Sequence, residues 1–501
     1  MTIDNLPKPT WARLGFPYAP DVNLSGKGIG MVVLDRLRPH PTLSHLGSRL
    51  KYIVVNDDLT VTQRDIAFEE PDTRHKAYGE HGLMVVNAMA HAPFEVDGHE
   101  YIGLAPAANY IVLNHGAFRE GEAARLKRGM GWILERRDEW NVKIVLTTGW
   151  AEADSLGSLE STDQKPVVQG LSHAVESGLL VIASNGNTKL ENELPPIEYF
   201  AVGCYLDNAF SDIRTILPNP DEPWGRNRDG HMRPDILAPR LYLTIPFCEV
   251  DQGSESIFSL VGGQARYKNR LSYGAQSSGT SALLTGVCAH ILSLYPKLGP
   301  EVLRRLLVAN GDPVDGSDNP APAVNVARAL KSLAEGNVPP RPHPYPPPIR
   351  VTHPEISIQS HDPVERGLAL TIMARQGKCD RDCLWRHAKD DSPTVRKVAV
   401  WFLQQPQDHH EREVYWQYLN AEPDGGVRGW LAYGLFHDST KEEIGQWIHW
   451  AEDVNWAVRW CVSEYLKKCP GFPRLEKVFD PALVRERALP VLEWYRQKGS
   501  G

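Results

Sequence analysis

Residues 30–35 read Gly-Met-Val-Val-Leu-Asp, an unbroken apolar run that ends on a carboxylate. Similar short runs, separated by Gly and Pro, occur later in the chain, at residues 52–55, 110–113, 143–146 and 179–183. Unbroken apolar runs of this length are typical of strands that are buried on both faces. These segments therefore predict the core strands of a covered sheet.

Helical patterns lie between the predicted strands, at residues 81–90, 122–140 and 167–177. Strands that alternate with helices predict an α/β fold, in which a parallel sheet carries helices on both faces. In such a sheet, ligands bind at the edge where the strands end. Polar residues that directly follow a strand, as Asp35 does, are therefore candidates for a functional site.

The composition is that of an ordinary globular protein, with 501 residues of which 42% are hydrophobic and 23% charged. The formal net charge is −8 and both signs are mixed along the chain. This argues against a nucleic-acid partner, which would favour a basic stripe. No apolar run reaches the roughly 18 residues of a membrane span. The N-terminus lacks a signal-peptide pattern, so we expect a cytoplasmic protein.

A proline-rich segment at residues 336–354 predicts a semi-rigid spacer between two domains, at residues 1–335 and 355–501. Beyond it the strand signals stop and a helical pattern recurs. A Val followed by an Arg within two positions returns at intervals of 31, 32 and 31 residues, with apolar residues four and eight positions after each Val. These offsets place the apolar side chains on one helix face. The recurring valines are Val364, Val395, Val427 and Val458.

This pattern resembles the HEAT family of helical repeats, in which pairs of helices bury their apolar faces by stacking. The units are short for that family, and an irregular helical bundle remains the alternative. The predicted architecture is therefore an α/β domain followed by an all-α domain.

Four polar residues occur in contexts that suit a serine nucleophile and its helpers. Asp35 ends a strand, His81 begins a helix, Asn187 follows a strand, and Ser281 opens an apolar helix, where its backbone N–H is expected to face an oxyanion. Taken singly, each has an ordinary structural role as a turn residue, a helix-start residue or a helix cap. Asn185 competes with Asn187 for the role of oxyanion donor.

The order of these residues resembles the subtilase family of serine peptidases. Asp after a strand, His-Gly opening a helix, Gly-Asn after a strand and Gly-Thr-Ser-Ala opening a helix follow the family's sequence of motifs. The turn at residues 103–108 and the Pro-Asp segment at residues 233–239 also resemble that family. The similarity covers about residues 10–330 and implies a subtilisin-like parallel sheet.

The resemblance implies that Ser281 is the nucleophile, His81 the general base and Asp35 the residue that orients it. Asn187 and the Ser281 N–H would form the oxyanion hole. The segment Thr147-Thr148-Gly149 takes the place of the strand and turn that line the substrate pocket. The implied protein is an intracellular serine endopeptidase that acts on protein or peptide substrates.

Some residues beside these motifs depart from the family pattern, at Arg36-Leu37, Leu83-Met84 and Thr285-Gly286. A catalytically inactive subtilase fold that serves as a protein-interaction scaffold therefore remains an alternative. Another acyl transfer on the same residues, such as peptide cyclisation, also stays open. No cofactor is expected, and His409-His410 lacks a third residue to complete a metal site.

Only 34 residues precede Asp35, so we expect the chain to lack the inhibitory prodomain of secreted subtilases. We therefore expect the helical repeats to recruit a substrate, to bind a regulatory protein or to control access to the active site. The seven cysteines are scattered and odd in number. We expect free buried thiols rather than disulfides, including at Cys379 and Cys383.

Overall fold

The structure is a computed structural model of the chain, which divides into two compact units with their main boundary between residues 347 and 348. No helix among the described residues is both long and apolar enough to cross a membrane. The structure describes residues 2–3, 7–37, 40–66, 68, 79–96, 98–117, 120–148, 166–186, 194–207, 216–219, 222–227, 231–245, 264–267, 272–275, 277–314, 319–337, 351–436, 438–468, 473, 475 and 481–498.

The first unit is built on a central sheet that has eight strands among the described residues. Every neighbouring pair is parallel except β3 with β4. The predicted parallel sheet is confirmed. In spatial order its strands are β13 (Ile236–Pro239), β10 (Phe200–Tyr205), β9 (Leu180–Ser184), β8 (Val142–Thr147), β2 (Gly30–Leu34), β7 (Asn109–Asn114), β3 (Leu50–Val55) and β4 (Val61–Arg64).

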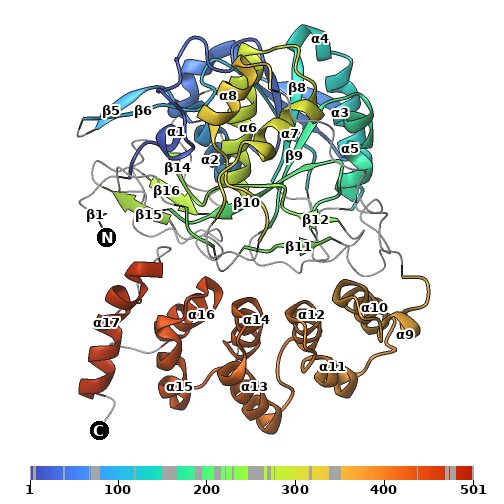
Figure 1. Cartoon of the computed structure of the whole chain (residues 1–501), viewed down its shortest axis with the longest axis vertical. Helices are drawn as coiled ribbons and strands as arrows, with labels where there is room; N and C mark the ends of the chain where they lie inside the picture. The colour runs from blue at the N-terminus through green and yellow to red at the C-terminus, as the bar shows by residue number, and fades with distance from the viewer. Residues whose placement is uncertain are drawn as a thin grey trace. The chain divides into compact units, whose positions relative to one another are not determined.

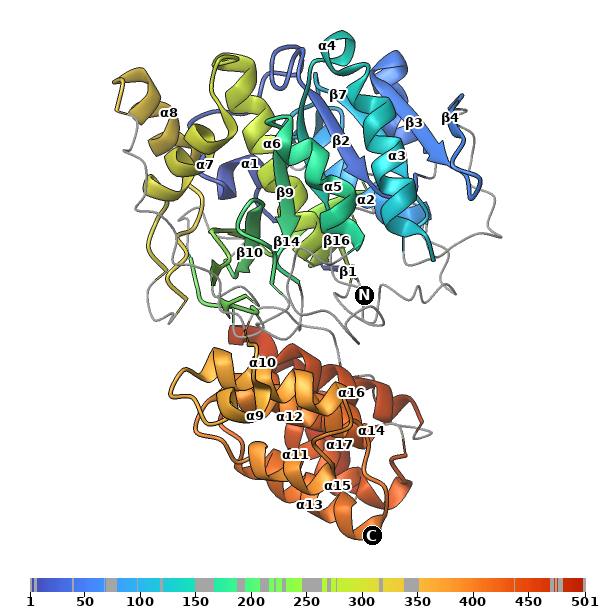
Figure 2. The same ribbon diagram turned by 90° about the vertical axis from the view of Figure 1, so that its right-hand side faces the viewer.

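Helices cover both faces of this sheet (Figure 1). They are α2 (Gly79–Ala90) and α6 (Ser277–Leu294) on one face, and α3 (Glu122–Leu134) and α5 (Pro166–Glu176), which lie side by side, on the other (Figure 2). Alternate residues of β2 point to opposite faces, so Val33 packs with α2 and α6 while Val32 packs with α3 and α5. Because both faces are covered, the whole of β2 is buried.

The predicted helix at residues 122–140 is interrupted. The chain leaves the helix after Leu134, and Arg136 has a non-helical backbone before a second short helix begins. The guanidinium of Arg136 stacks over the Trp132 ring at 3.7 Å and donates to the Trp132 carbonyl. The other α-helices that the structure describes in this unit are α1 (Thr10–Arg13), α4 (Arg137–Trp140), α7 (Pro300–Ala309) and α8 (Val326–Ala334), and Pro41–Arg49 forms a 3-10 helix.

A second, smaller sheet lies beside the helices that carry the candidate residues, because its strand β14 packs against both α2 and α6. This sheet was not predicted from the apolar pattern of the chain. Its strands are β1 (Thr2–Ile3), β15 (Gln264–Tyr267), β16 (Ser272–Ala275) and β14 (Leu241–Ile245). Shorter strands elsewhere are β5 (Phe94–Val96), β6 (His99–Tyr101), β11 (Gly225–Arg226) and β12 (Met232–Arg233).

The second unit is helical, as predicted for the region after the proline-rich segment. The helices that begin near the recurring valines, α10, α12, α14 and α16, lie side by side in chain order, and each of these valines is buried (Figure 1). The helices are α9 (Pro354–Ser357), α10 (Pro363–Arg375), α11 (Arg381–His387), α12 (Pro393–Leu403), α13 (His409–Ala421), α14 (Gly425–Phe436), α15 (Ile444–His449), α16 (Trp456–Lys467) and α17 (Pro481–Lys498).

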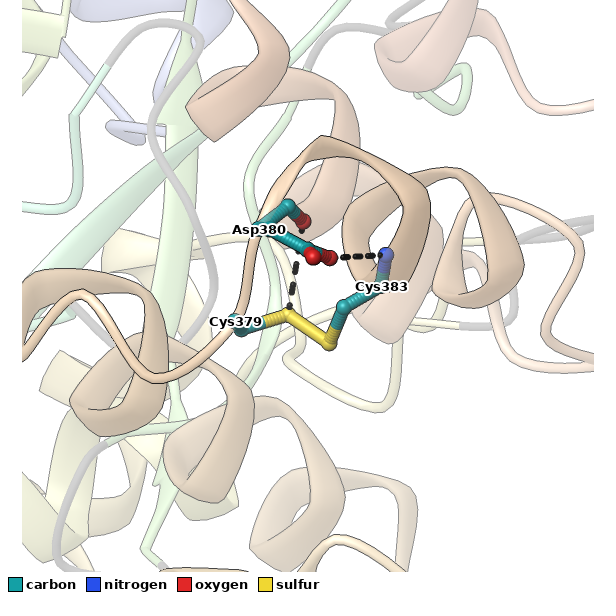
Figure 3. The surroundings of a disulfide bond; sticks show 3 residues. All are labelled: Cys379, Asp380 and Cys383. Carbon is teal, nitrogen blue, oxygen red and sulfur yellow. Dashed lines mark hydrogen bonds between the residues drawn. A yellow bond between two sulfur atoms is a disulfide. The ribbon is translucent and has the colours of Figure 1, made fainter.

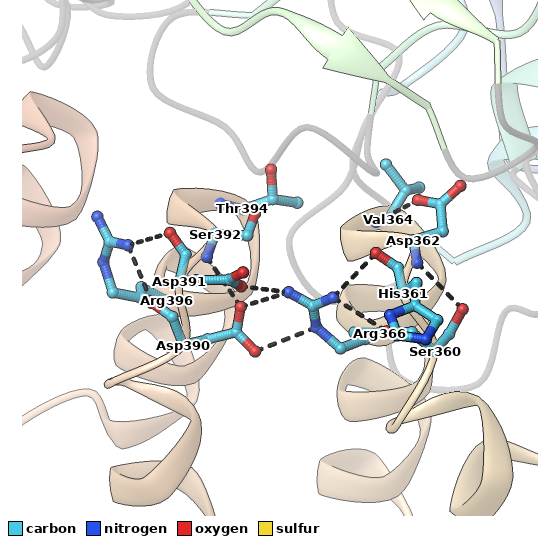
Figure 4. Close-up of polar contacts among 10 residues, drawn as sticks. All are labelled: Ser360, His361, Asp362, Val364, Arg366, Asp390, Asp391, Ser392, Thr394 and Arg396. Carbon is cyan, nitrogen blue, oxygen red and sulfur yellow. Dashed lines mark hydrogen bonds and ion pairs between the residues drawn. The ribbon is translucent and has the colours of Figure 1, made fainter.

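The arginines that follow the first three recurring valines each bind a carboxylate that lies ahead of the next valine-bearing helix. Arg366 donates Nη2 to Asp390 Oδ1 at 2.6 Å, and Arg396 donates Nη1 to the Asp390 carbonyl at 3.0 Å (Figure 4). Asp390 therefore binds one arginine with its side chain and the next with its backbone. The Asp390 carboxylate also accepts from the Ser392 N–H at 2.9 Å, ahead of α12.

This clamp repeats along the unit. Glu422 accepts from Arg396 with its carboxylate and from Arg428 with its carbonyl, and Asp453 does the same for Arg428 and Arg459. In the first repeat the corresponding position is Ser360, whose carbonyl accepts from Arg366. The position six residues before the arginine therefore carries a carboxylate in the three repeats where an arginine of the preceding repeat binds it, and a serine in the first repeat.

The expectation of free thiols at Cys379 and Cys383 is wrong, because these two residues form a disulfide (Figure 3). Asp380 caps α11 by accepting from the Cys383 N–H at 2.9 Å. This cap turns the chain so that the two Cα atoms lie 5.3 Å apart, within the range that a disulfide spans. The free cysteines that the structure describes are buried: Cys204, Cys288 and Cys461.

We predict that Arg396→Met destabilises the helical unit. The substitution leaves the Glu422 carboxylate, which is 5% exposed, without its charged partner. Loss of one partner from a largely buried ion pair costs about 3–5 kcal/mol. Urea unfolding of the full chain measures this loss. Lys378→Met is the control, since the Lys378–Glu355 pair is half exposed and its loss should not shift the transition. Equal transitions for both variants would contradict the clamp.

Candidate active site

Asp35 lies at the carboxyl edge of the central sheet, directly after β2. Its N–H donates to the Leu113 carbonyl at 3.2 Å, which continues the pairing of β2 with β7. Its Oδ1 accepts from the Arg36 N–H at 2.7 Å, and its Oδ2 lies 2.5 Å from Nδ1 of His81. Both carboxylate oxygens of Asp35 therefore have a hydrogen-bond partner, and the Asp35 side chain is only 10% exposed.

His81 is the third residue of α2, and its side chain is 14% exposed. Burial lowers the pKa of His81, but the charge and hydrogen bond of Asp35 raise it by more, so the net pKa is above the ordinary 6.5. With Nδ1–H bound to a carboxylate, the basic lone pair of the neutral ring is on Nε2. The pair is therefore arranged to take up a proton at Nε2.

Gly82 allows this contact to form. A Cβ at this position would overlap the Arg36 carbonyl and would lie against the Asp35 side chain. Only a glycine lets the start of α2 approach the end of β2 so closely. The His-Gly pair singled out in the sequence therefore combines the histidine that binds Asp35 with the glycine that allows the close approach.

Ser281 lies on α6, the helix that packs beside α2. Its side chain is fully buried, and its Oγ donates to the Ser278 carbonyl at 2.8 Å. A hydroxyl has one proton, so in this arrangement Ser281 does not donate to His81. The structure thus brings Asp35 and His81 together and places Ser281 on the neighbouring helix with its hydroxyl turned to the backbone.

The helix α6 begins at Ser277, within the segment at residues 277–282 that the sequence indicates as its opening. Ser281 is the fifth residue of this helix. The N–H of a fifth residue points to the carbonyl of the first, here Ser277, as in any α-helix. The Ser281 N–H is therefore directed into the helix and does not face an oxyanion site in this arrangement.

Residues that the sequence reasoning missed surround this helix start. Thr280 donates Oγ1 to the Pro239 carbonyl at 3.2 Å and contacts the Cys204 sulfur at 3.3 Å. Tyr242 packs against Gly279. Each contact joins residues more than 35 positions apart, and no local pattern in the sequence indicates them.

The other candidate residues are only partly described. Thr147 is buried at the end of β8, and the Thr148 carbonyl accepts from Ser184 Oγ at 2.8 Å. Gly149 and Asn187 lie outside the described residues. The competing Asn185 is buried directly after β9, where its N–H donates to the Val202 carbonyl at 2.9 Å.

Among the described residues, no three His, Cys, Asp or Glu side chains cluster closely enough to hold a metal ion.

Comparison with protein families gives a match to the model described as the subtilase family, over residues 26–327. This match covers more than half of the chain and contains Asp35, His81 and Ser281. No curated protein matches the sequence.

Several solved structures are similar to this chain. The protease domain of PatA, solved as a mutant, is 18% identical, covers 63% of this chain and 99% of its own, and has a TM-score of 0.41. The CspB protease of Clostridium perfringens is 12% identical, covers 65% and 99%, and has a TM-score of 0.45. Fervidolysin from Fervidobacterium pennivorans is 17% identical and has a TM-score of 0.40. The match covers 64% of this chain and 44% of the fervidolysin chain.

We predict that Gly82→Ala lowers the pKa of His81. The added Cβ pushes α2 away from the Arg36 carbonyl, which weakens the contact with Asp35 that raises this pKa, while burial still lowers it. His81 then becomes protonated only at a lower pH than in the wild type. A histidine NMR titration of the full chain measures the shift.

The control for this prediction is Gly131→Ala in α3, where an added Cβ meets no atom within 4 Å. This change should leave the His81 titration in place and stabilise the helix by about 0.5–1 kcal/mol. An unchanged His81 titration in Gly82→Ala would show that the close approach at Gly82 does not govern the Asp35–His81 contact.

Proposed function

Because the chain belongs to the subtilase family, we propose that it is a serine endopeptidase whose nucleophile, base and orienting carboxylate are Ser281, His81 and Asp35. The observation that carries this proposal is the 2.5 Å contact between Asp35 Oδ2 and His81 Nδ1. His81 lies on α2, which packs beside α6, the helix of Ser281. Peptides or proteins are the substrates that the family suggests.

In the proposed reaction, Ser281 Oγ attacks a peptide carbonyl carbon while His81 Nε2 takes the hydroxyl proton. The Asp35 carboxylate stabilises the resulting imidazolium, in keeping with the raised pKa of His81. The proton then passes to the leaving amine, and water repeats the sequence to release the acid and regenerate the hydroxyl. We assign Asn187 as an oxyanion donor, a role that contributes about 10²–10³ in rate. Thr147, Thr148 and Gly149 are assigned to substrate binding.

A second candidate function is a catalytically inactive fold that acts as an interaction scaffold. The specific observation in its favour is the buried Ser281 hydroxyl, which donates to Ser278 rather than to a base. The two functions differ in whether Ser281 ever becomes nucleophilic, and a reagent that reacts only with activated serines separates them.

We predict that a fluorophosphonate probe labels the wild-type chain and not Ser281→Ala. The probe forms a bond to an activated serine oxygen and loses fluoride, so labelling requires that Ser281 is deprotonated by His81. Ser293→Ala is the matched control, because Ser293 lies on the same helix and donates to the His290 carbonyl. Labelling should persist in this control. Equal labelling of wild type and Ser281→Ala would refute the assignment of the nucleophile.

We further propose that the helices from α10 to α17 are HEAT-like units that recruit a protein substrate or control access to the active site. The support is the recurrence of the valine–arginine pattern together with the repeated clamp between successive helices. Arrays of this kind offer extended binding surfaces. Tyr433 on α14 is 43% exposed and provides an aromatic contact for such a surface.

Recruitment predicts that Tyr433→Ala raises the KM for a folded protein substrate roughly fivefold, as for the loss of one aromatic contact. The KM for a short peptide ester, which needs only the active site, should not change. Tyr18→Ala is the matched control, since Tyr18 is 55% exposed in the first unit. If KM for both substrates is the same in Tyr433→Ala and wild type, this surface does not recruit substrate.

A further inference from the structure

Tyr242 lies against the first turn of α6. Its strand β14 packs beside α2 and α6, and the tyrosine is 1% exposed. A Cβ on Gly279 would overlap three carbons of the Tyr242 ring, so the ring rests directly on the Gly279 backbone. The same backbone hydrogen-bonds to the Tyr242 hydroxyl. Ring and hydroxyl thus hold one residue, two positions before Ser281.

This contact has the character of a helix cap. The first N–H groups of a helix have no carbonyl partner within it, and Gly279 is the third residue of α6. Such a third N–H usually bonds to the side chain of the residue that precedes the helix. Here a tyrosine from another strand takes that place. It therefore stabilises the turn formed by residues 277–280 in its helical form.

Thr280, the next residue of the same turn, makes a second set of contacts. Thr280 Oγ1 donates to the Pro239 carbonyl at 3.2 Å and lies 3.3 Å from Cys204 Sγ. Pro239 ends β13 and Cys204 is in β10, so the turn is fixed to the central sheet. Gly279 and Thr280, the two residues directly before Ser281, are therefore each held by a buried contact.

The helical turn determines the state of Ser281. While residues 277–280 are helical, the Ser281 N–H points to the Ser277 carbonyl and its Oγ donates to the Ser278 carbonyl at 2.8 Å. If the turn unwinds, Ser281 becomes the start of α6, its N–H loses its helical partner, and its hydroxyl loses the Ser278 acceptor. Both groups are then available to a substrate carbonyl and to His81.

We propose that residues 277–280 form a latch that holds Ser281 in a resting state, and that Tyr242 keeps this latch closed through Gly279. The proposal rests on the proposed function of Ser281 as a nucleophile. It makes Tyr242 a positioning residue, which acts through Gly279 and touches neither substrate nor the reacting atoms. Loss of the Tyr242 hydroxyl should open the latch more often without removing the ring that fills the core.

The test compares the full-length wild type with Tyr242→Phe. Tyr110→Phe is the matched control, since Tyr110 is equally buried in the same core and its hydroxyl donates to the Ala105 carbonyl at 2.9 Å. Hydrogen exchange of the peptide that contains residues 277–281 reports opening of the turn. The rate of fluorophosphonate labelling reports the reactivity of Ser281. Thermal unfolding checks that each variant is folded.

In Tyr242→Phe we expect faster exchange in residues 277–281 and labelling that is roughly three- to tenfold faster than in wild type, the effect of losing one cap. Tyr110→Phe should change neither rate. Unchanged exchange in Tyr242→Phe would overturn the latch. Faster exchange with unchanged or slower labelling would overturn its control over Ser281. Faster exchange with no labelling in any variant would leave the latch in place and refute the peptidase assignment instead.

Discussion

The carboxylate of Asp35 sets the main constraint on this fold. β2 is buried on both faces, so the first polar side chain after it emerges into a crowded, largely dry edge of the sheet. A carboxylate there requires donors for both oxygens. The Arg36 N–H supplies one and His81 the other, and the second donor requires that α2 comes close enough for Gly82 to touch the Arg36 carbonyl. The position of α2 follows from this requirement, and α6 packs against α2 in turn.

The two units bury their apolar side chains in different ways. In the first, long-range strand pairing creates a sheet whose two faces each need a layer of helices. In the second, neighbouring helices bury their apolar faces against each other, and the polar ends are joined by arginines and carboxylates. A residue such as Asp390 completes a helix start and an ion pair at once, so the local and tertiary interactions support each other.

Most of the sheet and its helices could be predicted because buried strands have unbroken apolar sequences and the intervening helices have periodic ones. Asp35 and His81 were candidates because the order of the motifs around them resembles the subtilase family, since a strand end or a helix start alone has an ordinary structural role. The state of Ser281 could not, because it depends on where α6 begins, and that start is stabilised by Tyr242 from a strand 37 positions earlier. The Cys379–Cys383 disulfide was missed for a local reason: spacing alone does not reveal the cap at Asp380 that brings the two residues together.

The arginine clamp also bears on how the helical unit can change over evolutionary time. Every internal repeat offers a carboxylate to the repeat before it and an arginine to the repeat after it, while Ser360 ends the series without a charge. Duplication or loss of one whole repeat therefore restores the same pairing at the new junction. The clamp itself therefore sets no fixed number of repeats, whereas each described strand of the central sheet pairs with its own particular neighbours.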